Sequence, residues 1–203
     1  MIAVVDYGMG NLRSVSKALE HLNARVQVTS DPNELKRADK IVVPGVGAFP
    51  AAMRELSARG LVEPIKDAVA SGKPYLGICL GLQVLFERGE EGEGAAGLGL
   101  LPGTVKRLTA APPLKIPHMG WNQVCRTSQD GCSLLEGIPD GSFFYFVHSY
   151  AADPRDRSVV TLESDYGGRF PAMISRGRLF ATQFHPEKSQ ALGLRVLQNF
   201  LAL

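Results

Sequence analysis

The chain has 203 residues, of which 22 are Lys or Arg and 20 are Asp or Glu, so its formal net charge is +2. A chain of this length can bury a large core without disulfides or a structural metal, and its balanced charge argues against a protein that binds duplex nucleic acid. Three cysteines without a Cys-x-x-Cys pair exclude a disulfide framework and a zinc ribbon.

The first half of the sequence alternates between short apolar runs and helical patterns. The apolar runs predict strands over residues 2–5, 26–28, 41–43 and 75–79. Apolar residues spaced three or four apart predict helices over 12–22, from Pro32 onward, in two pieces between 53 and 69, and over 80–87. Strands that alternate with helices indicate a parallel sheet covered on both faces.

The second half has a different pattern, in which strands follow one another with turns between them. Residues 89–99 are rich in Gly and Glu and are predicted to form a loop. The predicted strands cover 105–108, 143–147, 159–162, 172–175 and 179–184, and a helix over 192–201 follows them. We therefore expect a single α/β domain over residues 1–203, with a mostly parallel central sheet, flanking helices and added antiparallel strands.

The N-terminal residues predict the first strand directly. No basic segment or cleavage site precedes this apolar run, so we expect no signal peptide. No run of 18 apolar residues occurs, so we expect no membrane span. Together these features predict a cytoplasmic protein.

A nucleophile is indicated where the fourth predicted strand meets a helix. Residues 77–81 read Gly-Ile-Cys-Leu-Gly, the nucleophile-elbow pattern with Cys79 in place of serine. The flanking glycines leave room for the tight turn, and the start of a helix favours the reactive thiolate. A buried structural cysteine is the alternative interpretation of the same residues, because free cysteines are often buried.

A general base is indicated by one of the four histidines. His185 directly follows the predicted strand 179–184, and strand ends are where sites form in parallel sheets. Glu187 lies two residues further on and can orient the imidazole, which completes a nucleophile, base and orienting carboxylate. His148 is interpreted as a structural or pocket histidine and His118 as a packing or partner-contacting one. The histidines have no short ligand spacing, so no metal site is expected.

The elbow around Cys79 and the later His-Pro-Glu segment at 185–187 resemble the class I glutamine amidotransferases. Four further segments, together with the N-terminal 6–11, resemble the glutaminase subunits of imidazole glycerol phosphate synthase within that family. They are Pro-Gly-Val-Gly-Ala-Phe at 44–49, Pro-His-Met-Gly-Trp-Asn at 117–122, Tyr-Phe-Val-His-Ser-Tyr at 145–150 and His-Pro-Glu-Lys-Ser at 185–189. The resemblance extends from residue 6 to about residue 200, with gaps near 89–97 and 109–115.

The resemblance implies a reaction and roles for individual residues. Glutamine is hydrolysed to glutamate and ammonia through a thioester on Cys79, with His185 as base and acid and Glu187 as its orienting carboxylate. The backbone N–H groups of Val46 and Leu80 are expected to bind the oxyanion. The resemblance further implies that glutamine itself contacts Gly47, Gln83, Ser149 and Tyr150. No cofactor is expected.

The resemblance also implies a partner. Ammonia in neutral water is mostly ammonium, which has no free lone pair, so the product must pass directly to an acceptor site. The chain has no room for a second domain, and the acceptor is therefore expected on a cyclase subunit, a β/α barrel that makes imidazole glycerol phosphate and aminoimidazole carboxamide ribotide in histidine biosynthesis. Expected interface residues of this heterodimer are Asn11, Trp121, Tyr145 and Lys188. No nucleic acid or membrane partner is expected.

The sequence also allows three alternative functions: a dinucleotide-binding protein, a different cysteine hydrolase and an inactive scaffold. Gly8 and Gly10 resemble the start of a dinucleotide-binding fingerprint, but Arg13 stands where the third glycine belongs. A γ-glutamyl hydrolase or the glutaminase of another pathway shares the same triad, and the segments around Trp121 and Ser149 favour the histidine pathway. A catalytically dead regulatory scaffold is expected to have lost a triad residue, and all three are present.

Overall fold

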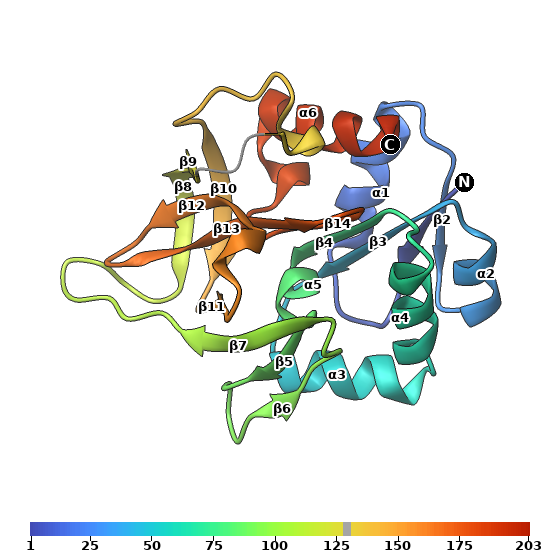
Figure 1. Ribbon diagram of the computed structural model, residues 1–203, viewed down its shortest axis with the longest axis horizontal. Coiled ribbons are helices and arrows are strands. Elements are labelled where there is room, and N and C mark those ends of the chain that lie inside the picture. Colours follow the sequence, from blue (N-terminus) through green and yellow to red (C-terminus); the bar gives the residue numbers. More distant parts are fainter. Residues whose placement is uncertain (128–130) are drawn as a thin grey trace.

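The computed structural model describes residues 1–127 and 131–203 and contains one large sheet and two smaller ones (Figure 1). The large sheet has eight strands in the order β2-β1-β3-β4-β14-β13-β12-β9. Their bounds are β1 Ile2–Val5, β2 Val26–Thr29, β3 Lys40–Gly45, β4 Tyr75–Cys79, β9 Cys125–Arg126, β12 Val160–Asp165, β13 Arg169–Arg176 and β14 Leu179–Thr182. The five strands β2, β1, β3, β4 and β14 pair in parallel, and β13, β12 and β9 extend the sheet in antiparallel pairs.

Helices cover both faces of the parallel part, as the sequence predicts. α1 (Leu12–His21) and α6 (Gln190–Ala202) lie on one face, and α3 (Phe49–Ala58) and α4 (Val62–Ala70) lie on the other (Figure 1). The short helix α2 (Pro32–Arg37) begins where the side chain of Asp31 accepts a hydrogen bond from the N–H of Asn33 at 2.8 Å.

The alternation of side chains along each central strand produces two cores. In β1, Ile2 and Val4 join the cluster under α1 and α6, whereas Ala3 and Val5 join the cluster under α3 and α4. All four residues are buried. A parallel strand that is buried on both faces must be apolar throughout, and the uninterrupted apolar run of residues 2–5 therefore predicted β1.

The two smaller sheets complete the second half of the chain. β10 (Phe143–His148) pairs antiparallel with β8 (His118–Gln123). The other sheet has the order β11-β7-β5-β6, with β5 Phe86–Gly89, β6 Ala95–Ala96, β7 Leu101–Arg107 and β11 Tyr150–Pro154. Three 3-10 helices lie at Ser133–Leu135 (η1), Arg157–Val159 (η2) and Pro186–Lys188 (η3). No helix within the described ranges has the length and apolar character needed to cross a bilayer.

The structure corrects the predictions for residues 80–99. The helix expected over 80–87 ends early: α5 covers Leu80–Gln83, and Phe86–Gly89 forms strand β5. Val84, Leu85 and Phe86 are all fully buried, so the run has no polar face from which a helix and a strand could be told apart. The loop expected over 89–99 also contains β6.

Candidate active site

Cys79 lies at a strained turn between β4 and α5. Its φ of 55° and ψ of −103° place it in a backbone conformation that residues with a side chain rarely adopt. A Cβ at Gly77 would lie 2.4 Å from the carbonyl oxygen of Gly81, and a Cβ at Gly81 would lie 1.8 Å from that of Val43. Both glycines are therefore required by the close approach of the backbone, which is the nucleophile-elbow geometry predicted from the sequence.

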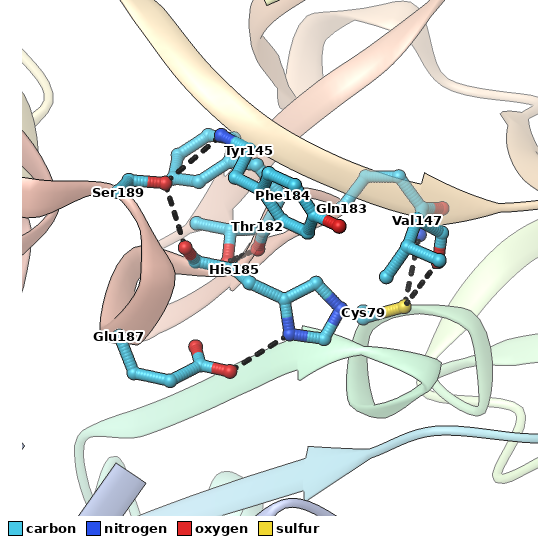
Figure 2. Close-up of polar contacts among 9 residues, drawn as sticks. All are labelled: Cys79, Tyr145, Val147, Thr182, Gln183, Phe184, His185, Glu187 and Ser189. Carbon is cyan, nitrogen blue, oxygen red and sulfur yellow. Dashed lines mark hydrogen bonds and ion pairs between the residues drawn. The ribbon is translucent and has the colours of Figure 1, made fainter. Parts of the chain in front are cut away.

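His185 and Glu187 form a buried pair next to the elbow. His185 follows β14, the strand that pairs in parallel with β4, and Glu187 lies in η3. The two side chains are 2% and 1% exposed, and Nδ1 of His185 lies 2.8 Å from Oε1 of Glu187. Figure 2 shows the imidazole ring between this carboxylate and the sulfur of Cys79. Nε2 of His185 is buried and makes no hydrogen bond within the described part of the chain.

The electrostatics of this pair favour the imidazolium. Burial lowers the pKa of His185, but its contacts with Cys79 and Glu187 outweigh burial and raise the pKa to about 10. With Nδ1 directed at the carboxylate, Nε2 is the nitrogen left to exchange a proton with the thiol. This geometry is that of a nucleophile, a base and an orienting group.

The sulfur of Cys79 makes two further polar contacts (Figure 2). It lies 3.8 Å from the carbonyl oxygen of Val147, to which a thiol can donate, and it accepts from Nε2 of Gln183 at 3.5 Å. Gln183 is fully buried. The first contact suits the protonated thiol, and the second suits either form but strengthens with negative charge.

A pocket of about 290 Å³ opens beside Cys79. All the residues that the sequence assigned to the oxyanion and to glutamine line it: Val46, Gly47, Leu80, Gln83, Ser149 and Tyr150. Gly45 pairs with Cys79 in the register of β3 and β4, so the residue that follows each of them lies at the same end of the sheet. In residues 1–127 and 131–203, no group of three or more His, Cys, Asp or Glu side chains is arranged to hold a metal ion.

A second pair of histidines, His118 and His148, lies at the pocket, and His148 is one of the residues that line it. Nδ1 of His148 lies 2.9 Å from the carbonyl oxygen of Tyr150, and Nε2 of His148 lies 3.0 Å from Nδ1 of His118. Since a carbonyl only accepts, His148 donates from Nδ1 and accepts at Nε2, so His118 is the donor between the two rings. Burial lowers the pKa of His118 to about 4 and, with the charges of His118 and His185, lowers that of His148 to about 3.

Three of the four expected interface residues are brought together. The rings of Trp121 and Tyr145 pack edge to face at 6.2 Å, and Nζ of Lys188 lies 5.7 Å from the centre of the Tyr145 ring. Trp121 is 47% exposed, and Met119 beside it on β8 is 65% exposed. Asn11 precedes α1, which packs against η3, the element that contains Lys188.

Two residues of the site were not singled out from the sequence. Glu91 lines the pocket, and its Oε2 accepts a hydrogen bond from the N–H of Phe49 at 2.6 Å. Gln183, the residue that contacts the sulfur, stands two positions before His185. The sequence did carry a signal, because Gln183 stands in the predicted strand 179–184, and a buried polar side chain needs a partner.

The family model "Glutamine amidotransferase class-I" matches residues 3–203. The chain belongs to the class I glutamine amidotransferase family. Among curated members of this family, a protein of Rhodopirellula baltica named imidazole glycerol phosphate synthase subunit HisH is 54% identical over 98% of this chain and 96% of its own length. A protein of Moorella thermoacetica with the same name is 56% identical over 98% of this chain and 93% of its own. The family resemblance expected from the sequence motifs is confirmed.

Two solved structures share the fold of this chain. A structure described as a glutamine amidotransferase superposes with a TM-score of 0.76 at 20% identity and covers 100% of this chain and 98% of its own. A structure described as PurLQS from Thermotoga maritima gives a TM-score of 0.75 at 22% identity and covers 99% of this chain and 97% of its own. The expected mostly parallel α/β fold with added antiparallel strands is confirmed.

Proposed function

We propose that the chain is the glutaminase subunit of imidazole glycerol phosphate synthase, in which it hydrolyses glutamine and passes the ammonia to the cyclase subunit for histidine biosynthesis. The observation that carries the chemistry is the arrangement of Cys79, His185 and Glu187 beside the pocket. Near-complete alignment with relatives named as this subunit supports the pathway.

The reaction begins from an imidazolium–thiolate pair, in which Nε2 of His185 already carries the proton of the Cys79 thiol because the raised pKa of His185 favours its charged form. The thiolate then attacks the side-chain amide carbon of glutamine, and the oxygen of that amide becomes an oxyanion. His185 returns its proton to the nitrogen, ammonia leaves, and a thioester with Cys79 remains. Water activated by His185 attacks the thioester, which releases glutamate and restores the thiol. Glu187 stabilises the imidazolium during each transfer.

The backbone N–H groups of Val46 and Leu80 bind the oxyanion in this proposal. Both residues line the pocket and follow the paired positions Gly45 and Cys79. Such donors typically contribute about 10²–10³-fold each to the rate. Gly45 and Gly47 flank Val46, and glycine tolerates the positive φ that reorientation of this peptide needs; Gly47 has a φ of 108°. We infer that hydrolysis is slow until the liganded partner is bound.

The pocket supports the assignment of glutamine to Gly47, Gln83, Ser149 and Tyr150, which all line it with Cys79. Gln83 donates to the carbonyl oxygen of Tyr150 and to Oε1 of Gln183, at 2.9 and 3.2 Å. Both amide hydrogens are thereby used, so the group that Gln83 offers to a ligand is its own carbonyl oxygen. That acceptor suits the ammonium group of an amino acid.

The cyclase subunit docks, in this proposal, where Trp121, Tyr145 and Lys188 meet, with Asn11 at the edge of the interface. Exposed aromatic side chains beside a cation are typical of interface centres. Residues 1–203 act as one glutaminase domain, which the family match over 3–203 supports. We place the heterodimer in the cytoplasm, since all three cysteines are free and a thiol nucleophile fits a reducing compartment.

The test is glutamate release from glutamine by the purified chain, alone and with a cyclase subunit and its ribonucleotide ligand. We expect the liganded partner to raise the rate at least about tenfold, and Cys79→Ala to abolish it. Turnover that depends on Cys79 but does not respond to the partner would retain the chemistry and reject the assigned partner. Turnover that survives Cys79→Ala would reject the nucleophile.

A further inference from the structure

Gln183 makes a contact with the nucleophile that the triad does not include. Its Nε2 lies 3.5 Å from the sulfur of Cys79, within the range of hydrogen bonds to sulfur, and the side chain is completely buried. The backbone N–H of Gln183 donates to the carbonyl oxygen of Ala172 at 2.8 Å, which fixes the residue to the neighbouring strand β13. The amide is therefore held in place rather than free to turn toward solvent.

The orientation of the Gln183 amide is determined by the backbone carbonyl of Tyr150, which acts on it through the side chain of Gln83. The carbonyl oxygen of Tyr150 can only accept, so the side chain of Gln83 must direct its NH₂ group toward it. The second hydrogen of this NH₂ group is donated to Oε1 of Gln183 at 3.2 Å. With its oxygen engaged in this way, Gln183 must present its own NH₂ group to the sulfur of Cys79.

We propose that Gln183 takes part in the glutaminase reaction by holding the sulfur of Cys79 and stabilising its thiolate through a donated hydrogen bond. A donor in a buried site that is already oriented stabilises a developing anion without reorganisation. The role rests on the proposed function, because it concerns the nucleophile of that reaction. Gln83 acts through Gln183 as an orienting residue.

Replacing Gln183 removes no titratable group near the sulfur, so the substitution tests the amide itself. The titratable groups around Cys79 are His185 and Glu187 beside β14, His148 on β10, Tyr7 after β1, and Glu91 in the pocket wall. A shift that appears on loss of the Gln183 amide alone is therefore assigned to that amide.

The experiment measures the rate at which iodoacetamide alkylates Cys79 as a function of pH, resolved by peptide mass spectrometry because Cys125 and Cys132 are also free thiols. We expect Gln183→Leu to move the midpoint of this profile upward by about one pH unit, equivalent to about tenfold slower alkylation near neutral pH. For glutamine hydrolysis with the liganded partner, we expect kcat to fall about tenfold and KM to change little. If the leucine variant does not fold, the same measurement is made on Gln183→Met, because methionine is unbranched like glutamine but has no hydrogen-bond donor.

The matched control is Thr182→Val, at the last residue of β14 and next to Gln183 in the sequence. Thr182 is also completely buried, but its Oγ1 donates to the carbonyl oxygen of Phe184 at 2.9 Å and does not contact the sulfur. We expect it to leave the alkylation profile unchanged. Gln83→Met should shift the profile in the same direction as Gln183→Leu but by less, and the double variant should resemble Gln183→Leu alone.

Alkylation profiles of Gln183→Leu and Gln183→Met that match the wild type would overturn the proposal and leave the glutaminase assignment intact. A wild-type chain that releases no glutamate with the partner would overturn the glutaminase assignment. The alkylation profile would then still decide whether Gln183 stabilises the thiolate.

Discussion

Two pairs of buried side chains near the pocket, each built on histidine, behave in opposite ways. His185 lies against the carboxylate of Glu187 and the sulfur of Cys79, and its pKa is raised to about 10. His118 and His148 lie against each other, a backbone carbonyl and aromatic rings, and their pKa values are lowered to about 4 and 3. Burial lowers the pKa at all three positions, so the difference comes from the partners. Anionic partners keep a buried imidazole protonated, whereas neutral partners keep it neutral.

The two pairs also change the stability of the fold with pH in opposite directions. Between pH 6.5 and about 10, His185 holds its proton in the folded chain but not in the unfolded one. Its contribution is therefore complete below pH 6.5 and is lost as the pH rises through about 10. His118 and His148 stay neutral in the folded chain between pH 6.5 and about 4. Their contribution is complete above pH 6.5 and is lost as the pH falls.

The largest effect is expected from His185→Gln, which removes the proton carrier but leaves an amide that can donate to Glu187. Because general acid–base catalysis typically contributes 10²–10⁴-fold, we expect kcat for glutamine hydrolysis to fall by about 10³-fold or more. The exposed His21→Gln is the matched control and should retain full activity. Comparable losses in both variants would show that His185 has no special role.

Glu187→Gln tests directly whether the carboxylate distinguishes the two pairs. It removes a group that raises the pKa of His185, so we expect kcat to fall by about 10²-fold and the alkaline limb of kcat/KM to move to lower pH. The measurement is a pH–rate profile, with the exposed Glu20→Gln as control. An alkaline limb that stays in place would separate Glu187 from the titration of His185.

The smallest effect on catalysis is expected from His118→Phe, which addresses the neutral pair. The new ring can keep the stacking on Phe146 and Tyr166, but Nε2 of His148 loses its donor. We expect the free energy of unfolding in urea to fall by about 1–3 kcal/mol, and the rate to change by a few-fold at most. Stability should also depend less on pH between 6.5 and about 4, because one titrating group is gone. Unchanged stability would mean that the bond between the rings contributes nothing.

The elements that could be predicted from the sequence are those whose patterns are local. β1, β3 and β4 are uninterrupted apolar runs, and the elbow at Cys79 is encoded by two glycines within five residues. β8 was missed because its exposed Met119 and Trp121 reverse the usual burial of apolar side chains. β5 was assigned to a helix because the run Val84–Phe86 is fully buried, and the pairing of β5 with β6 and β7 depends on residues further along the chain. Pairing between distant segments leaves no local pattern.

The candidate site divides in the same way. Cys79, His185 and Glu187 could be proposed from the sequence because each stands in a short motif, and the structure brings the three side chains together. The contact of Gln183 with Cys79 was not readable, because it joins residues 104 positions apart and depends on which way an amide faces. The pairing of His118 with His148 likewise follows from the register of β8 and β10.

The glycines at and beside the elbow limit how such a site can change over evolutionary time. At Gly81 a single methyl group would strike β3, and at Gly45 it would strike the hydroxyl of Tyr7 and the side chain of Leu80. The close spacing of the ends of β3 and β4 beside the sulfur therefore requires residues without a Cβ at Gly45 and Gly81. Even a substitution by alanine, which adds only a methyl group, would clash at both positions. A lineage that acquires a new substrate must therefore vary the side chains of the pocket wall while it inherits the backbone around the nucleophile unchanged.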